Sequence, residues 1–329
     1  MSKGQINSVL GPISPDKLGA TLMHEHFVAS FDGWVSDQTI VPYQRDKIME
    51  INLKWLKEVK DLGIQTVVDA TSNDLCRDPI LMRNLSQKSG LNIICATGLY
   101  YENLGAAHYW NFLRDNGSSI EEMIYEMMVK EITVGIGDTG VKAGVIKVAT
   151  GRGHATGYEL AVVRAGGRAS KDTGVPVITH TEGPTLGPEQ ADWLMATGAN
   201  PKQIMIGHMN NSNNILYHQS ILLRPDVSLG FDRTGLNPPI AGGTLAEIEA
   251  TIAKLCSMGY AGRICLSHDY VGYWHTRKFE WADGGHQEEY HYPTYISTQA
   301  IPHLKALGVT REQINQIMVE NPKRLFTGH

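Results

Sequence analysis

Short apolar runs alternate with amphipathic segments along nearly the whole chain. The apolar runs are typical of buried parallel strands, and apolar residues spaced three and four apart predict the helices that cover them. The predicted strands span residues 19–23, 66–69, 92–96, 144–149, 175–179, 203–206, 227–231 and 263–267. The predicted helices span residues 46–62, 78–89, 119–134, 158–173, 188–197, 214–223, 244–258, 295–306 and 311–319.

This regular alternation predicts an α/β fold of parallel strands joined by helical crossovers. Eight strand–helix units in 329 residues favour a closed (β/α)8 TIM barrel over an open sheet, and we expect a single domain over residues 1–329. No G-x-G-x-x-G turn follows the first strand, so a dinucleotide-binding fold is disfavoured. In such barrels the reacting groups lie at the carboxyl ends of the strands.

The composition argues against several other classes of protein. A net charge of −5 without a basic run disfavours nucleic-acid partners, and no apolar run reaches the ~20 residues that span a bilayer. The amino terminus lacks the charged and apolar regions of a secretory signal. The four cysteines form no C-x-x-C pair and are typical of core residues in a reducing compartment. We therefore expect a cytoplasmic protein with a small-molecule partner.

Metal-binding side chains stand at the ends of several predicted strands. His24 and His26 are two residues apart, so both imidazoles point to one face of a strand. Such a pair alone also fits surface or capping histidines. Further along the chain, the same kind of position is occupied by Lys147, His180, His208 and Asp269. A barrel would bring these side chains to one end, which predicts a metal centre.

Lys147 lies between apolar residues within its predicted strand. Burial beside metal cations would lower the pKa of its ammonium group, and the neutral amine can add CO₂ to form a carbamate. This anion can bridge two divalent metal ions. The alternative is a structural lysine whose stem extends along the barrel toward water.

A series of motifs points to a family. They are Val9-Leu10-Gly11-Pro12, His24-Glu25-His26, Ala96-Thr97-Gly98-Leu99-Tyr100, Ile146-Lys147-Val148-Ala149, Thr179-His180-Thr181, Ile206-Gly207-His208, Phe231-Asp232-Arg233-Thr234-Gly235, Ser267-His268-Asp269 and Glu320-Asn321-Pro322. In order and spacing the chain resembles the phosphotriesterase family of the amidohydrolase superfamily, including its phosphotriesterase-like lactonases. The resemblance covers nearly the whole length.

The resemblance implies a dinuclear metal centre. His24, His26 and Asp269 would hold the more buried ion, His180 and His208 the more exposed one, and carboxylated Lys147 (N6-carboxylysine) would bridge them. Zinc is the favoured metal, with iron, cobalt or manganese as alternatives. A metal-bridging hydroxide would attack the ester, and Asp269 would accept its proton as general base. The preceding residue, His268, should point away from this centre.

The resemblance also implies substrate-binding roles for Tyr100 and Arg233, which occupy pocket positions of the lactonase branch. Alternatively, Tyr100 packs at the rim and Arg233 forms a surface ion pair with Asp232. The sequence departs from the family at residues 210–213, where Asn-Asn-Ser-Asn replaces aspartates that pass the proton outward. Arg233 also replaces a relay histidine of the phosphotriesterases proper. These departures favour lactones over phosphotriesters, because asparagine accepts no proton at neutral pH.

Residues 270–294 form a long loop after the eighth predicted strand, and loops of this length commonly line active sites. Its aromatic residues would wall an apolar pocket. Arg277 and Lys278 are more typical of a solvated charge pair than of residues that contact a substrate. The spacing of His275, His286 and His291 does not support a second metal site.

The expected function is dinuclear metal-dependent opening of lactones or related carboxylic esters. The alternatives are an organophosphate or phosphoester hydrolase and a ligand-binding paralogue without catalysis. Only the resemblance implies the oligomeric state, which would be a homodimer.

Overall fold

Eight parallel strands form the centre of a computed structural model of the chain, which describes residues 4–236, 243–278 and 293–329. The strands pair in sequence order and are β3 (Thr21–Glu25), β4 (Thr66–Asp69), β5 (Asn92–Gly98), β6 (Val145–Thr150), β7 (Val177–Thr181), β8 (Ile204–Ile206), β9 (Ser228–Phe231) and β10 (Ile264–Leu266). The segment after β10 returns to β3, where the amide of Asp269 donates to the carbonyl of His24 at 3.0 Å. The predicted (β/α)8 barrel is confirmed.

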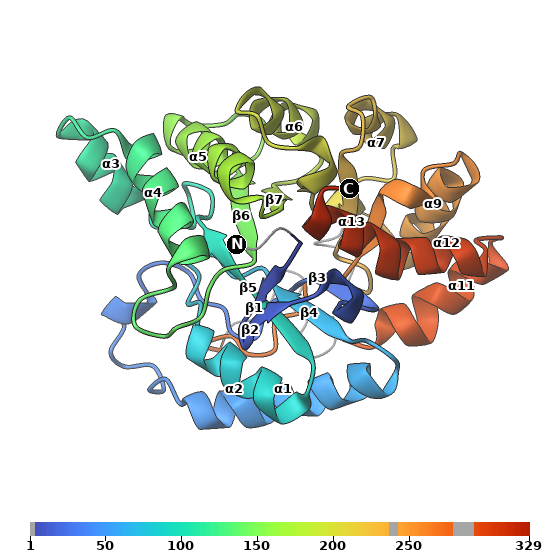
Figure 1. Cartoon of the computed structure of the whole chain (residues 1–329), viewed down its shortest axis with the longest axis horizontal. Helices are drawn as coiled ribbons and strands as arrows, with labels where there is room; N and C mark the ends of the chain where they lie inside the picture. Colours follow the sequence, from blue (N-terminus) through green and yellow to red (C-terminus); the bar gives the residue numbers. More distant parts are fainter. Residues whose placement is uncertain (1–3, 237–242, 279–292) are drawn as a thin grey trace.

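Helices surround the barrel and cover the outer faces of the strands (Figure 1). The α-helices are α1 (Arg45–Asp61), α2 (Pro79–Ser89), α3 (Ala107–Asp115), α4 (Ile120–Thr133), α5 (Gly157–Thr173), α6 (Gly187–Ala196), α7 (Ile215–Leu222), α9 (Leu245–Ser257), α11 (Ile301–Ala306), α12 (Arg311–Asn315) and α13 (Asn321–Thr327). Two π-helical turns, η6 (Ile296–Ala300) and η7 (Gln316–Glu320), interrupt the last helices. The 3₁₀ turns are η1 (Pro15–Lys17), η2 (Trp34–Ser36), η3 (Pro201–Gln203), η4 (Met209–Asn211) and η5 (Ala261–Arg263).

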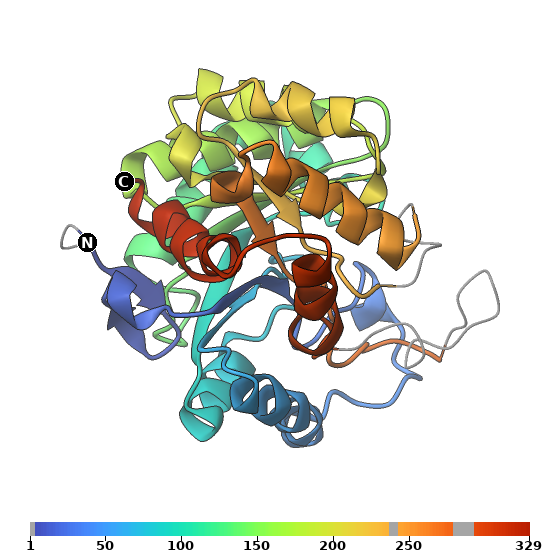
Figure 2. The same ribbon diagram turned by 90° about the vertical axis from the view of Figure 1, so that its right-hand side faces the viewer.

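A short antiparallel hairpin, β1 (Ile6–Ser8) and β2 (Gly11–Ile13), lies across one end of the barrel (Figure 2). Ile6, Leu18 and Phe326 pack with apolar side chains of the barrel interior in one cluster. Asn7 anchors the hairpin, because its side-chain amide donates to the carbonyls of Ile132 and Ala143 at 3.1 and 2.9 Å. Apolar side chains thus fill the amino-terminal end of the barrel, and the cavity described below lies at the carboxyl ends of the strands.

Each predicted strand overlaps an observed one, although β3 and β7 each begin and end two residues later than predicted. The hairpin and α3 are absent from the prediction. The two strands of the hairpin have three residues each, which is too short for an alternating pattern to be visible. All four cysteines are free; Cys95, Cys256 and Cys265 are buried in the core as predicted, whereas Cys76 is only partly buried. Within the described residues, no helix has the length and apolarity needed to cross a membrane.

The ion pair of Arg77 with Glu131 ties the segment after β4 to α4. The guanidinium donates twice to the carboxylate, at 2.8 and 2.9 Å, and also to the carbonyl of Ala96 at 2.7 Å. Burial alone would raise the pKa of Glu131, but the hydrogen bonds and charge of Arg77 bring that pKa below its ordinary value. The pair therefore keeps a buried carboxylate ionised.

Replacing Arg77 by methionine should lower the free energy of unfolding by about 3 kcal/mol, because it leaves the largely buried Glu131 carboxylate without a counter-charge. Urea denaturation of the metal-free protein measures this change. The matched control is Arg114→Met, which removes an exposed pair with Asp115 and should change the unfolding free energy by less than about 1 kcal/mol. Equal stability of the Arg77 and Arg114 variants would contradict the assigned role of the buried pair.

Candidate metal centre

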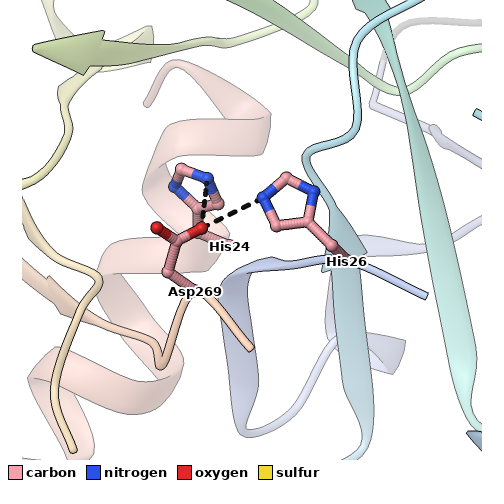
Figure 3. A group of neighbouring side chains, drawn as sticks. All are labelled: His24, His26 and Asp269. Atoms are coloured by element: carbon pink, nitrogen blue, oxygen red, sulfur yellow. Dashed lines mark hydrogen bonds and ion pairs between the residues drawn. The ribbon is translucent and has the colours of Figure 1, made fainter. Parts of the chain in front are cut away.

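The end of β3 brings two histidines and Asp269 together (Figure 3). The Nε2 atoms of His24 and His26 lie 3.3 and 3.0 Å from the same oxygen, Oδ1 of Asp269. The side chain of Glu25, between the two histidines, contacts the segment after β10 and accepts from the amides of His268 and Tyr270 at 2.9 and 2.8 Å. Alternation along the strand therefore gives one face to the candidate ligands and the other to a carboxylate that holds the chain around Asp269 in place.

Lys147 reaches the same place from β6. Its side chain is 1% exposed, and its Nζ lies 2.9 Å from Nε2 of His24. Gly98 on the neighbouring strand has φ 132°, and a Cβ there would lie only 1.8 Å from the carbonyl oxygen of Lys147, so only glycine lets the strands approach this closely. Burial lowers the pKa of Lys147 to about 8, although Asp269 and Asp232 counteract this effect. A substantial fraction of the amine is therefore neutral near pH 8 and able to react with CO₂.

His180 and His208 form a second pair of candidate ligands. Nδ1 of His180 and Nε2 of His208 face each other at 2.7 Å. Burial lowers the pKa of His180 to about 4 and that of His208 well below its ordinary value. Both imidazoles are therefore neutral at pH 7, as metal ligation requires, and a shared cation would satisfy both inward-facing nitrogens.

Asp232 links the two groups of histidines. The sequence had predicted for it only a surface ion pair with Arg233, as one of two alternatives. Its carboxylate lies 2.8 Å from Nδ1 of His24 and 2.9 Å from Nδ1 of His208. Burial would raise the pKa of this carboxyl group, but the two histidines hold the pKa well below its ordinary value. Because Asp232 engages the Nδ1 atoms, both rings are oriented with Nε2 toward the centre.

Two sets of three side chains among the described residues have the spacing of metal ligands: His24 with His26 and Asp269, and His24 with His208 and Asp232. We assign the first set as ligands. In the second set, Asp232 lies against ring nitrogens that point away from the first set, so it fits a hydrogen-bonding role that fixes the tautomers. The available sequence cue was an acidic residue directly after the buried strand end Gly230-Phe231.

Asp232→Asn should weaken metal binding by about 10- to 100-fold, because asparagine keeps only one acceptor oxygen and its NH₂ group would face the Nδ1 atom of one of the two histidines. Competition with a chelator of known affinity measures the effect. Asp226→Asn is the matched control: this exposed aspartate precedes the same strand and has φ 66°, which asparagine tolerates. Unaltered metal affinity in the Asp232 variant would contradict this role.

The side chain of Arg233 lies inside the site, so the alternative of a surface ion pair with Asp232 is wrong. Its Nε donates to Oδ2 of Asp269 at 2.8 Å and its Nη1 to Oδ1 of Asn211 at 3.3 Å. Oδ1 of Asn210 accepts from the backbone amide of Arg233 at 2.9 Å. The asparagines that depart from the family pattern thus hold this arginine. The hydroxyl of Tyr100 lies 3.3 Å from Nδ1 of His180, so Tyr100 also reaches the candidate centre.

A cavity of about 450 Å³ opens over these side chains and is lined by all six candidate ligands together with Tyr100 and Arg233. Its apolar wall includes Phe31, Leu75, Leu104, Leu236 and Trp274. The volume is within the range of small-molecule sites. The polar centre and apolar wall together suit a substrate with one reactive polar group and an apolar part.

Part of the predicted loop 270–294 borders this cavity, through Val271 and Trp274. His275 packs against the rings of Trp34 and Tyr43, and Arg277 pairs with Asp37, so neither contacts the metal centre. His268 lies against Glu25 and points away from the ligands, as predicted. Residues 279–292, with His286 and His291, lie outside the described residues.

Residues 4–326 match the sequence profile of the phosphotriesterase family. The chain belongs to this family. An organophosphorus hydrolase from Deinococcus radiodurans has a similar structure, with a TM-score of 0.94 and 41% identity over 99% of this chain and 97% of that one. A mutant of a PTE-like lactonase from the same organism has a TM-score of 0.93 and 41% identity, over 98% and 99% of the two chains.

An aryldialkylphosphatase of Saccharolobus solfataricus is 33% identical over 327 residues, which cover 96% of this chain and 97% of the relative. The relatives named here are hydrolases, and their names divide between lactones and organophosphorus esters. As a member of this family the chain is a hydrolase, and the class of ester has to be decided from its own residues.

Proposed function

We propose that this protein hydrolyses lactones or related carboxylic esters at a dinuclear metal centre. The observation that carries the proposal is the convergence of six candidate ligand side chains at one end of the barrel, where they line a cavity with an apolar wall. His24, His26 and Asp269 would hold one ion, His180 and His208 the other, and Lys147 as its carbamate would bridge them. Zinc is the favoured metal, with iron, cobalt or manganese as alternatives.

Bound divalent ions would supply an acidified water and polarisation of the substrate's carbonyl oxygen. Asp269 is suited to accept the proton released when the ester is attacked. Burial would raise the pKa of this carboxyl group, but its neighbours His24 and the guanidinium of Arg233 hold the pKa well below its ordinary value, so Asp269 is ionised at neutral pH. Arg233, 2.8 Å from Oδ2, fixes the orientation of the carboxylate.

Tyr100 is suited to donate a hydrogen bond to the substrate. Burial raises the pKa of its hydroxyl well above the ordinary value, so Tyr100 keeps its proton throughout the working range of pH. Its position beside Nδ1 of His180 places this donor over the second pair of candidate ligands. We propose that it orients the ester oxygen, while the apolar wall with Phe31 and Trp274 receives the acyl or ring portion.

The residues around Arg233 favour carboxylic esters over phosphotriesters. Asn210 and Asn211 hold the backbone and side chain of Arg233, and neither amide accepts a proton at neutral pH. Where the phosphotriesterases proper would carry acidic and imidazole groups that relay a proton from the metal centre to the surface, this chain has an arginine held by two asparagine side chains. Hydrolysis of organophosphorus esters is the second candidate, favoured by the names of two relatives. A paralogue without catalysis is disfavoured by the complete set of ligands.

The test is proton release from γ- and δ-lactones of graded chain length, with a phosphotriester alongside, on metal-replete protein. We expect kcat/KM for at least one lactone to exceed that for the triester. Faster turnover of the triester would overturn the choice of ester class while leaving the metal centre in place. Turnover of neither class would place the substrate outside both.

A further inference from the structure

His180 is oriented in the opposite way to the other candidate ligand histidines. His24, His26 and His208 each have Nδ1 within 2.9 Å of a side-chain oxygen and direct Nε2 inward. In His180 the inward atom is Nδ1, and Nε2 lies 3.1 Å from Oε2 of Glu182. Glu182 is therefore to His180 what Asp232 is to His24 and His208.

Besides the hydroxyl of Tyr100, which lies 3.3 Å from Nδ1, two contacts of His180 fix its backbone and the plane of its ring. The ring of Tyr101 stacks on the imidazole at 5.3 Å with an interplanar angle of 16°, and the side-chain amide of Gln190 donates to the carbonyl of His180 at 2.8 Å. A half-turn of the imidazole about Cβ–Cγ would preserve both contacts but would replace Nδ1 by a carbon atom. The contact with Glu182 opposes this half-turn, because it requires an N–H group at the Nε2 position, and the hydroxyl of Tyr100 would lose its acceptor at Nδ1. Of the two, only Glu182 requires the proton to be on Nε2.

Glu182 is itself held in place at the edge of the cavity. Its backbone carbonyl accepts from the hydroxyl of Thr185 at 2.9 Å, and Thr185 in turn accepts from the amide of Gly153 at 3.1 Å. Oε1 of Glu182 lies 3.8 Å from the guanidinium of Arg152, while Oε2 faces His180. One oxygen is therefore committed to the histidine and the other faces a cation at the cavity edge.

We propose that Glu182 is a positioning residue that fixes His180 in the Nε2-protonated tautomer, with the Nδ1 lone pair directed at the second metal ion. The inference rests on the proposed dinuclear centre and adds a residue that the sequence analysis missed. The effect is confined to the ion shared with His208, because the groups around His24 and His26 have their own partners in Asp232 and Thr71.

Glu182→Ala should weaken binding of the second metal equivalent by about 10- to 100-fold and leave the first unchanged. Zinc titration of the metal-free protein against a chelator measures the two affinities separately. Glu182→Gln keeps an oxygen that accepts from Nε2, so it should bind the second equivalent nearly as tightly as the unaltered protein. The control is Glu189→Ala, at an exposed glutamate in the first turn of α6. Thermal melts of the metal-free variants identify any loss of folding.

Equal affinity for both equivalents in Glu182→Ala and the unaltered protein would overturn the inference. A Gln variant as weak as the Ala variant would also overturn it, because the hydrogen bond would then not be the cause. If the unaltered protein binds only one equivalent of zinc, the proposed dinuclear centre is wrong, and this result comes from the unaltered protein alone. The two failures are therefore distinguishable.

Discussion

A Lys147→Met protein should fold normally and lose at least about 10³-fold in kcat/KM, equivalent to about 4 kcal/mol. Methionine fills the same buried space on β6 but forms no carbamate. The substitution also removes the Nζ atom that lies 2.9 Å from Nε2 of His24. Two cations would have to approach each other without a bridging anion from the protein.

The measurement is ester hydrolysis together with metal content after reconstitution of metal-free protein, with and without added bicarbonate. The unaltered protein should require bicarbonate for full activity, and the variant should not respond to it. Lys142→Met is the matched control, because Lys142 is exposed and lies shortly before the same strand. Full activity of the Lys147 variant would contradict the bridging role.

The second large effect is expected at Asp269. Asp269→Asn should lower kcat by about 10²- to 10⁴-fold, the usual contribution of a positioned general base, because the amide has the same shape but accepts no proton. The substitution also leaves the guanidinium of Arg233, now 2.8 Å from the carboxylate, without its anionic partner. We expect the loss mainly in kcat, since substrate contacts through Tyr100 and the apolar wall are unchanged.

Steady-state kinetics on a lactone that the unaltered protein hydrolyses separate kcat from KM. The control is Asp192→Asn on α6, which removes an exposed carboxylate that pairs with Arg224 and lies away from the metal centre. An Asp269 variant with unchanged kcat and full metal content would refute the base role. If metal content falls together with kcat, the result supports Asp269 as a metal ligand. Hydrolysis by the same variant at a metal concentration that restores full metal content then tests the base role separately.

The strands could be predicted from the sequence, with their ends placed to within two residues, because buried parallel strands leave a clear apolar pattern. His24, Lys147 and His208 all follow or interrupt such runs, and the barrel topology alone brings them to one end. Burial also lowers the pKa of all three groups, which keeps both imidazoles neutral at pH 7 and leaves a substantial fraction of the Lys147 amine neutral near pH 8. The fold and the six candidate ligands could thus be predicted from this single sequence.

The residues that orient the ligands were much harder to predict. Glu25 and Asp232 act across the barrel, on partners more than twenty residues away in sequence, and their roles depend on which ring nitrogen they face. Arg233 illustrates the same difficulty, because its neighbour Asp232 is the obvious partner in sequence but Asp269 is the partner in space. Both residues lie in the turn after β9, where Asp232 turns to His24 and His208 and Arg233 turns to Asp269, so the ion pair suggested by sequence proximity is wrong.

The most direct test of the central claim is a metal titration of the metal-free protein with activity followed in parallel. The account predicts that hydrolysis of a lactone rises until two divalent ions are bound per chain in the presence of bicarbonate, and that the Lys147→Met protein shows no such rise. Full hydrolysis by protein without bound metal, or saturation of activity at one ion per chain, would contradict the dinuclear centre.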